Sequence, residues 1–158
     1  MRTAHPRRPD PTAPSRASSA MVLGVGVVAL AGMAYCHIKD VGMKFDEHVY
    51  YMAALFCGNI AASLLLIPAV LIFGDRGDRR EIAVWAAVGA LASLTIAGFL
   101  WSRTVGFPQM EDHVGEWDVL GLSSLAFESV LVLVSLRQLA GMPVPLTARI
   151  RSTHGGLS

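Results

Sequence analysis

Residues 50–101 read YYMAALFCGNIAASLLLIPAVLIFGDRGDRREIAVWAAVGALASLTIAGFLW. This stretch holds two long apolar runs separated by the charged segment GDRGDRRE (74–81). An α-helix needs about 20 predominantly apolar residues to cross the hydrocarbon core of a bilayer. Each run approaches or exceeds that length. The polar segment between them contains two glycines and is short enough for a tight turn. The stretch therefore predicts two antiparallel membrane-spanning helices.

Similar apolar runs lie on either side of this hairpin, so the sequence predicts four spans at about 18–36, 49–73, 82–101 and 119–136. A hydrophobic content of 53% and a mean hydropathy of +0.50 fit an integral membrane protein of this size. The predicted fold class is all-α, a four-helix transmembrane bundle over residues 18–139. Residues 1–17 carry four Pro and four Arg and are expected to form a disordered basic cytoplasmic tail, with a flexible cytoplasmic tail at 140–158.

The charges divide unequally between the two sides of the predicted bundle. With both termini in the cytoplasm, ten of the thirteen Lys and Arg residues lie inside, and seven of the twelve carboxylates lie outside. Basic residues accumulate in cytoplasmic loops of membrane proteins. We therefore expect an N-in, C-in protein of the cell membrane, with the lipid bilayer as its surroundings and no nucleic-acid partner.

The first span also has features of a secretory signal peptide. A basic start precedes an apolar run in which Ala29-Leu30-Ala31 offers a cleavage site. The apolar run continues through Cys36 without a polar break, however. We expect an uncleaved first helix.

Small residues recur at helical spacing in every span. Lipid provides no hydrophobic drive between helices, so close packing of small residues must supply much of their association. Such residues favour a compact bundle, or a homo- or hetero-oligomer formed through the same faces. The stripes are Ala20, Gly24, Val28, Gly32 and Cys36; Ala54, Gly58 and Ala62; Gly89, Ser93 and Ala97; and Gly121, Ser124, Glu128 and Ser135.

Glu128 is the one ionisable residue within a predicted span. It lies about 14 Å from the outer end of the fourth span, near the bilayer midplane. A charge at that depth is costly, so its side chain should face the bundle interior. Asn59 lies at a similar depth and is its predicted hydrogen-bond partner, with Ser93 within a turn of the same level. Either Glu128 is a proton- or cation-binding carboxylate, or it is a neutral side chain that hydrogen-bonds between helices.

The predicted outer side carries histidines and acids that could converge. His37, His48 and His113 are weak candidates for a metal site or, in pairs, for axial ligation of a haem. None belongs to a compact ligand motif, so we expect a solvated acidic surface, with a metal or haem site and a partner-docking face as the alternatives. The sequence calls for no cofactor and leaves a haem or transition metal open. Glu116 and Trp117 precede the fourth span, where Trp117 suits an interfacial anchor.

The segments SRTVGFP (102–108), Glu116-Trp117 and GLSSLAFE (121–128) resemble a pattern SRTxGLPG, EW and GLxSLxxE. That pattern recurs in small four-span integral membrane proteins of actinobacteria. The likeness covers about a third of the chain, and Phe107 and Gln109 replace the usual Leu and Gly. It implies an integral membrane protein, draws attention to Glu116, Trp117 and Glu128, and carries no activity.

Three functions compete, and we expect the first. The first is an accessory or structural protein that binds a partner through its outer loops or bundle faces. The second is a proton- or cation-coupled transporter subunit that uses Glu128, and the third is a haem- or metal-binding redox protein that uses the outer histidines. An enzyme is not expected, because the sequence shows no nucleophile–base pair and no phosphate-binding loop.

Overall fold

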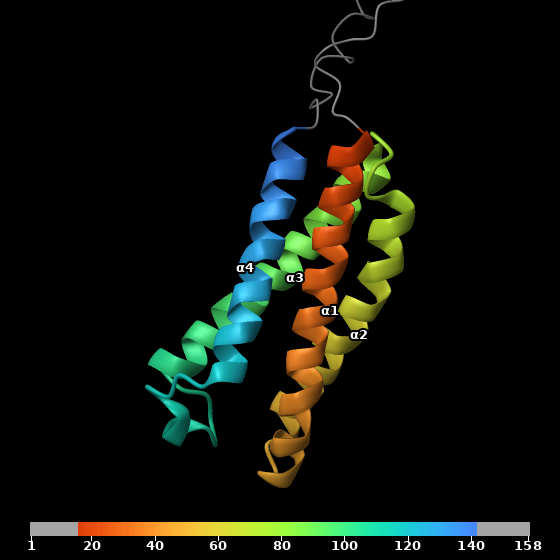
Figure 1. Cartoon of the computed structure of the whole chain (residues 1–158). Helices are drawn as coiled ribbons and strands as arrows, with labels where there is room; N and C mark the ends of the chain where they lie inside the picture. The colour runs from red at the N-terminus through yellow and green to blue at the C-terminus, as the bar shows by residue number, and fades with distance from the viewer. Residues whose placement is uncertain (1–15, 142–158) are drawn as a thin grey trace, which may run out of the picture.

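A computed structural model describes residues 16–141, which form four α-helices and no strand. The helices are α1 (Arg16–Asp46), α2 (Tyr50–Phe73), α3 (Arg79–Thr104) and α4 (Val119–Ala140), with a short 3₁₀ helix, η1 (Glu111–His113), before α4 (Figure 1). All four α-helices are long and apolar enough to cross a membrane. The predicted all-α four-helix bundle is therefore confirmed.

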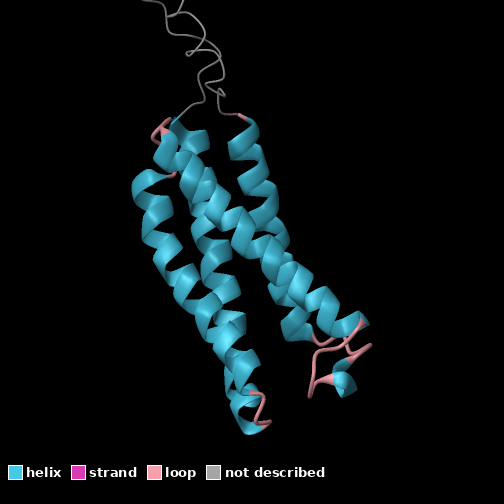
Figure 2. Ribbon diagram, turned by 180° about the vertical axis from the view of Figure 1, so that it is seen from behind, coloured by secondary structure: helices cyan, strands magenta, loops and turns pink. Residues whose placement is uncertain are grey.

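The helices form a ring in which α1 packs against α2 and α4, and α3 packs against α4 and, less extensively, against α2. The start of α1, the α2–α3 turn and the end of α4 share one end of the bundle, here called the terminal end (Figure 1). The opposite end, the loop end, carries the α1–α2 turn and the α3–α4 connection (105–118). The α1–α2 pair and the α3–α4 pair diverge toward the loop end (Figure 2).

Two aspartates begin the third and fourth helices. The Asp78 side chain accepts hydrogen bonds from the backbone N–H groups of Arg80 (2.8 Å) and Glu81 (3.2 Å). Asp118 accepts one from the N–H of Gly121 (2.7 Å). Such caps satisfy donors that have no partner within the helix. They fix the turn predicted at 74–81 and the end of the long connection.

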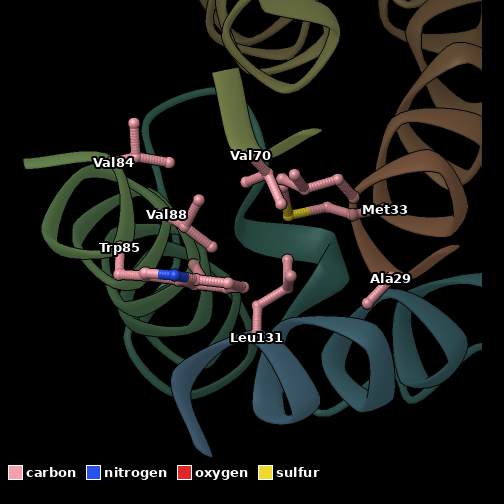
Figure 3. Packing of buried hydrophobic residues seen from close by; sticks show 9 residues of the cluster. Ala29, Met33, Val70, Val84, Trp85, Val88 and Leu131 are labelled. Atoms are coloured by element: carbon pink, nitrogen blue, oxygen red, sulfur yellow. The ribbon is translucent and has the colours of Figure 1, made fainter. Parts of the chain in front are cut away.

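The terminal half of the bundle is filled by a tightly packed apolar cluster. Trp85 of α3 is fully buried at its centre (Figure 3) and donates its indole N–H to the carbonyl of Gly74 (3.1 Å). The C-terminus of α2 thus supplies a buried acceptor for the indole. The cluster comprises Ala29, Leu30, Met33, Val70, Val84, Trp85, Val88, Ala92 and Leu131.

Only some of the predicted small-residue stripes lie at helix contacts. Gly32 faces the ring of Phe127, and Gly89 faces Ser135 of α4. Gly24 and Gly58 are exposed instead, with no neighbouring atom within 4 Å of an added Cβ. Most of the stripes on α1 and α2 therefore face lipid, and the sequence could not tell these faces apart.

The helix boundaries differ from the predicted spans mainly in α1. It continues ten residues past Cys36 to Asp46, beyond the predicted span 18–36, and it starts at Arg16, inside the segment assigned to the tail. α4 extends to Ala140. Pro68 lies within α2 without ending it. The remaining tail residues, 1–15 and 142–158, lie outside the described part of the chain.

The contact between α1 and α4 can be tested at Gly32. A Cβ at this position would lie 2.6 Å from two atoms of the Phe127 ring, so we expect Gly32→Ala to destabilise the bundle by about 1–3 kcal/mol. Thermal unfolding of the purified protein in detergent measures the change. Gly24→Ala is the matched control, since that Cβ meets nothing and alanine favours the helix. Equal unfolding temperatures for the two variants would contradict the packing described here.

Candidate functional site: a cavity at the loop end

A cavity of about 480 Å³ lies between the diverging helix pairs. All four helices contribute to its lining, which runs from the exposed Glu47 and Glu116 at the loop end down to Glu128. Asp118 and Glu128 are ten residues apart on α4, so the cavity extends along about 15 Å of that helix. The apolar cluster of the terminal half closes its floor.

Glu128 lies at the deep end of this cavity. Its side chain is 1% exposed, which confirms the prediction that it faces the bundle interior. Oε1 accepts a hydrogen bond from the hydroxyl of Ser124, one turn earlier on α4 (2.8 Å). Among residues 16–141, Oε2 has no hydrogen-bond partner. A buried acceptor without a partner is costly, and such groups often mark functional positions.

The polar partners predicted for Glu128 lie elsewhere. Asn59 donates from Nδ2 to the hydroxyl of Thr95 on α3 (2.8 Å) and lines the cavity with it. It does not bond to Glu128, so the predicted pair is wrong. Ser93 is exposed on the outer face of α3, because it lies two residues, about 200° of helical rotation, from the inward-facing Thr95. The depth of these residues follows from their position along the span, whereas the direction of each side chain around the helix does not.

Both basic side chains that line the cavity are held in ion pairs. Lys44 is buried, and its Nζ lies 2.7 Å from Oε2 of Glu47. Arg103 pairs with Asp118, donates to the carbonyl of His113 (3.3 Å) and lies over the ring of Phe99. The Arg103 contacts connect the end of α3 to the start of α4 across the intervening loop.

The three candidate histidines occupy three different environments. His37 is buried and hydrogen-bonds through Nδ1 to the carbonyl of Met33 (2.9 Å), with its ring edge-on to Phe56. His113 bonds to Glu116 through Nδ1 (2.9 Å) and lies 3.8 Å from Glu47. His48 is exposed at the α1–α2 turn. His37 and His113 line the cavity, but no three His, Cys, Asp or Glu residues in the described part of the chain are placed to hold a metal.

The Glu116-Trp117 pair marks the rim. Glu116 lines the cavity and hydrogen-bonds to His113. Trp117 is half exposed and packs edge-on against Phe99, with 5.8 Å between the ring centroids. Trp117 thus supports the helix on which Arg103 sits.

The sequence interpretation missed the cavity wall that α1 supplies beyond its predicted end. His37, Asp40, Val41 and Lys44 are buried or half-buried and recur at spacings of three and four residues. That spacing places them on one helix face. The periodicity was visible in the sequence, but the high charge of the segment made it resemble a loop.

Fold and site together define a small α-helical membrane protein with a cavity that opens at one end. Comparisons with protein-family models, curated protein sequences and solved structures yield no match for the chain.

Arg103 should hold the α3–α4 connection in place. We expect Arg103→Ala to speed amide hydrogen exchange at Gly115, whose N–H donates to the Arg103 carbonyl (2.9 Å), by about tenfold or more. The loss of the Asp118 and His113 contacts is the cause. Arg76→Ala serves as control, because Arg76 is an exposed residue of the distant α2–α3 turn that bonds to Ile72. Unchanged exchange at Gly115 in Arg103→Ala would show that the loop is held by other contacts.

Glu47 should respond to pH through Lys44. The hydrogen bond from Lys44 lowers the pKa of Glu47 below its ordinary value of 4.5. Because the folded pKa is the lower one, the pair stabilises the fold above pH 4.5, and this contribution disappears as pH falls through the lowered value. We expect Lys44→Gln to return the pKa of Glu47 toward 4.5 in an NMR titration. A pKa that does not move would exclude the hydrogen bond as its cause.

Proposed function

We propose that the protein is a membrane-embedded binding protein that receives a small amphipathic molecule in the loop-end cavity. The observation that carries this proposal is the cavity itself, with its apolar walls and the buried, half-unpartnered carboxyl group of Glu128 at its floor. Small-molecule sites are typically concave, mostly apolar and supplied with a few convergent polar groups, at volumes of about 300–1,000 Å³.

The charge distribution supports entry from outside the cell. Of the eight basic residues within 16–141, the loop end carries Lys39, Lys44 and Arg103, and the positive-inside rule assigns the less basic end to the outer face. The apolar cluster closes the terminal half. Leu55 and Leu94 line the cavity and are largely exposed, so its wall between α2 and α3 also borders the lipid. A molecule that partitions into the outer leaflet could enter by either route.

The geometry favours this function over the accessory role and the redox role. An accessory role leaves the cavity without a purpose, and the histidines that a haem or metal site would use lie apart. We propose binding, because the cavity combines apolar walls with a buried carboxyl group. A transporter would also need the terminal half of the bundle to open after the loop end closes. Uptake of the bound molecule into proteoliposomes would reveal this additional step.

Thiol labelling tests whether the cavity admits water from the outer side. In a Cys36→Ala, Cys57→Ala background, we expect Ser124→Cys to react with membrane-impermeant trimethylammonium methanethiosulfonate added to intact cells. Ser124 lines the cavity, and cysteine closely matches its size. Ser129→Cys is the matched control on the lipid-facing side of the same helix and should remain unmodified. Equal labelling of both positions, or of neither, would remove the proposed function.

A second pair of variants tests whether access runs through the cavity. Gly98 lines it, and an added Cβ there meets nothing within 4 Å, so a phenylalanine side chain can enter the cavity without displacing the backbone. We expect Gly98→Phe to slow labelling of Ser124→Cys at least about tenfold. Gly58→Phe places the same ring on the exposed side of α2 and should leave the labelling rate unchanged.

A further inference from the structure

We propose that the molecule bound in the loop-end cavity is an organic cation, an apolar body with an ammonium group that pairs with Glu128. This inference rests on the proposed function and adds the chemical class of the ligand. It follows from the oxygen of Glu128 that lacks a hydrogen-bond partner, from the ion pairs that hold both neighbouring basic side chains, and from the apolar and aromatic residues of the cavity walls.

The floor of the cavity presents an acceptor that lacks a donor. Glu128 is 1% exposed and lines the cavity, and its Oε2 has no partner among the described residues, while Ser124 already donates to Oε1. The nearby Asn59 and Thr95 bond to each other. A ligand that donates a hydrogen bond at this point supplies what the protein does not.

The charges along the cavity select a positive ligand. Its lining holds five carboxylates against two basic side chains. Both basic groups are paired, Lys44 with Glu47 and Arg103 with Asp118, whereas Asp40 forms no ion pair within the described part of the chain. An anion would meet unpaired carboxylates and no free base. The lining carboxylates are Asp40, Glu47, Glu116, Asp118 and Glu128.

His37 adds a second acceptor to this set. Its Nδ1 contacts the carbonyl oxygen of Met33, which can only accept, so Nδ1 carries the proton. In the neutral ring Nε2 is then an acceptor. The side chain lines the cavity on α1, opposite the α3–α4 pair. It therefore adds no free donor that would attract an anion.

The walls suit the apolar body of such a ligand. Phe56 and Phe107 offer aromatic surface, and Met52 and Met110 add thioethers. Aromatic rings attract cations through their quadrupole, and methionine adapts its shape to different partners. The window beside Leu55 and Leu94 would let the apolar part remain in contact with lipid.

Three fluorescent probes with one aromatic body test the ligand class. Dansylcadaverine ends in an ammonium group, and two dansylamides of similar length end in a hydroxyl or a carboxylate. Dansyl emission reports binding to the purified full-length protein in dodecyl maltoside. We expect the ammonium probe to bind at least about tenfold more tightly than the hydroxyl probe, and the carboxylate probe least. Equal affinities, or a preference for the hydroxyl probe, would overturn the inference.

Glu128→Gln examines the residue itself. This substitution keeps the shape and the acceptor for Ser124 but removes the charge, so we expect it to weaken the ammonium probe about tenfold and to leave the hydroxyl probe within about twofold. Loss of both probes to the same extent would contradict a charge-specific role. The comparison among probes on the unmodified protein remains decisive if the variant does not fold.

The outcomes separate this inference from the proposed function. If the cavity binds nothing, the emission of each probe is the same with the unmodified protein and with Gly98→Phe, and Ser124→Cys is not labelled. If the cavity binds but its ligand is not a cation, labelling persists and the preference for ammonium is missing. Addition of phosphatidylethanolamine or phosphatidylglycerol to the micelles identifies the source of the cation. Displacement by phosphatidylethanolamine alone would indicate a lipid headgroup, and no displacement by either would indicate a free amine.

Discussion

The burial of Trp85 is the interaction on which the bundle depends. Its indole ring packs against Gly26 of α1 and contributes to the cluster that contains Val70 and Leu131. Its N–H donates a hydrogen bond to the carbonyl of Gly74, the residue that follows α2. In lipid, helices associate through close packing and hydrogen bonds, because apolar surface gains nothing by leaving hydrocarbon. One large side chain that contacts three neighbouring helices therefore holds the terminal half together (Figure 3).

Tight packing at one end has a consequence at the other. The helix pairs meet in the terminal half and diverge toward the loop end (Figure 2), and α2 packs against α3 less extensively than the other neighbouring α-helices pack against each other. Polar side chains occupy the space that results, and two ion pairs line it. Glu128 lies between the two halves, with apolar packing on one side and the cavity on the other. Its unpartnered oxygen is the feature that apolar packing does not explain.

The sequence predicted those properties that depend on composition and missed those that depend on rotation about a helix axis. The number of apolar helices follows from the apolar runs, and that prediction is confirmed, whereas α1 is longer than its predicted span. The burial of Glu128 also followed, because a carboxyl group in a membrane must face protein. Asn59 and Ser93 were assigned by depth alone, yet one faces Thr95 and the other faces lipid. Hydrophobic periodicity distinguishes such faces poorly when every face of the helix is apolar.

The extension of α1 beyond Cys36 places one side of the helix against lipid and the other against the cavity, two surroundings of different dielectric constant. Ile38 and Phe45 are half exposed on its outer side, whereas His37, Asp40 and Lys44 line the cavity. A hydropathy value averaged over this segment combines the apolar outer face with the charged cavity face and describes neither of them. Water in the proposed binding cavity would solvate the charged face below the membrane surface. The effective thickness of the insulating layer that α1 crosses would then be smaller on the cavity side than on the lipid side.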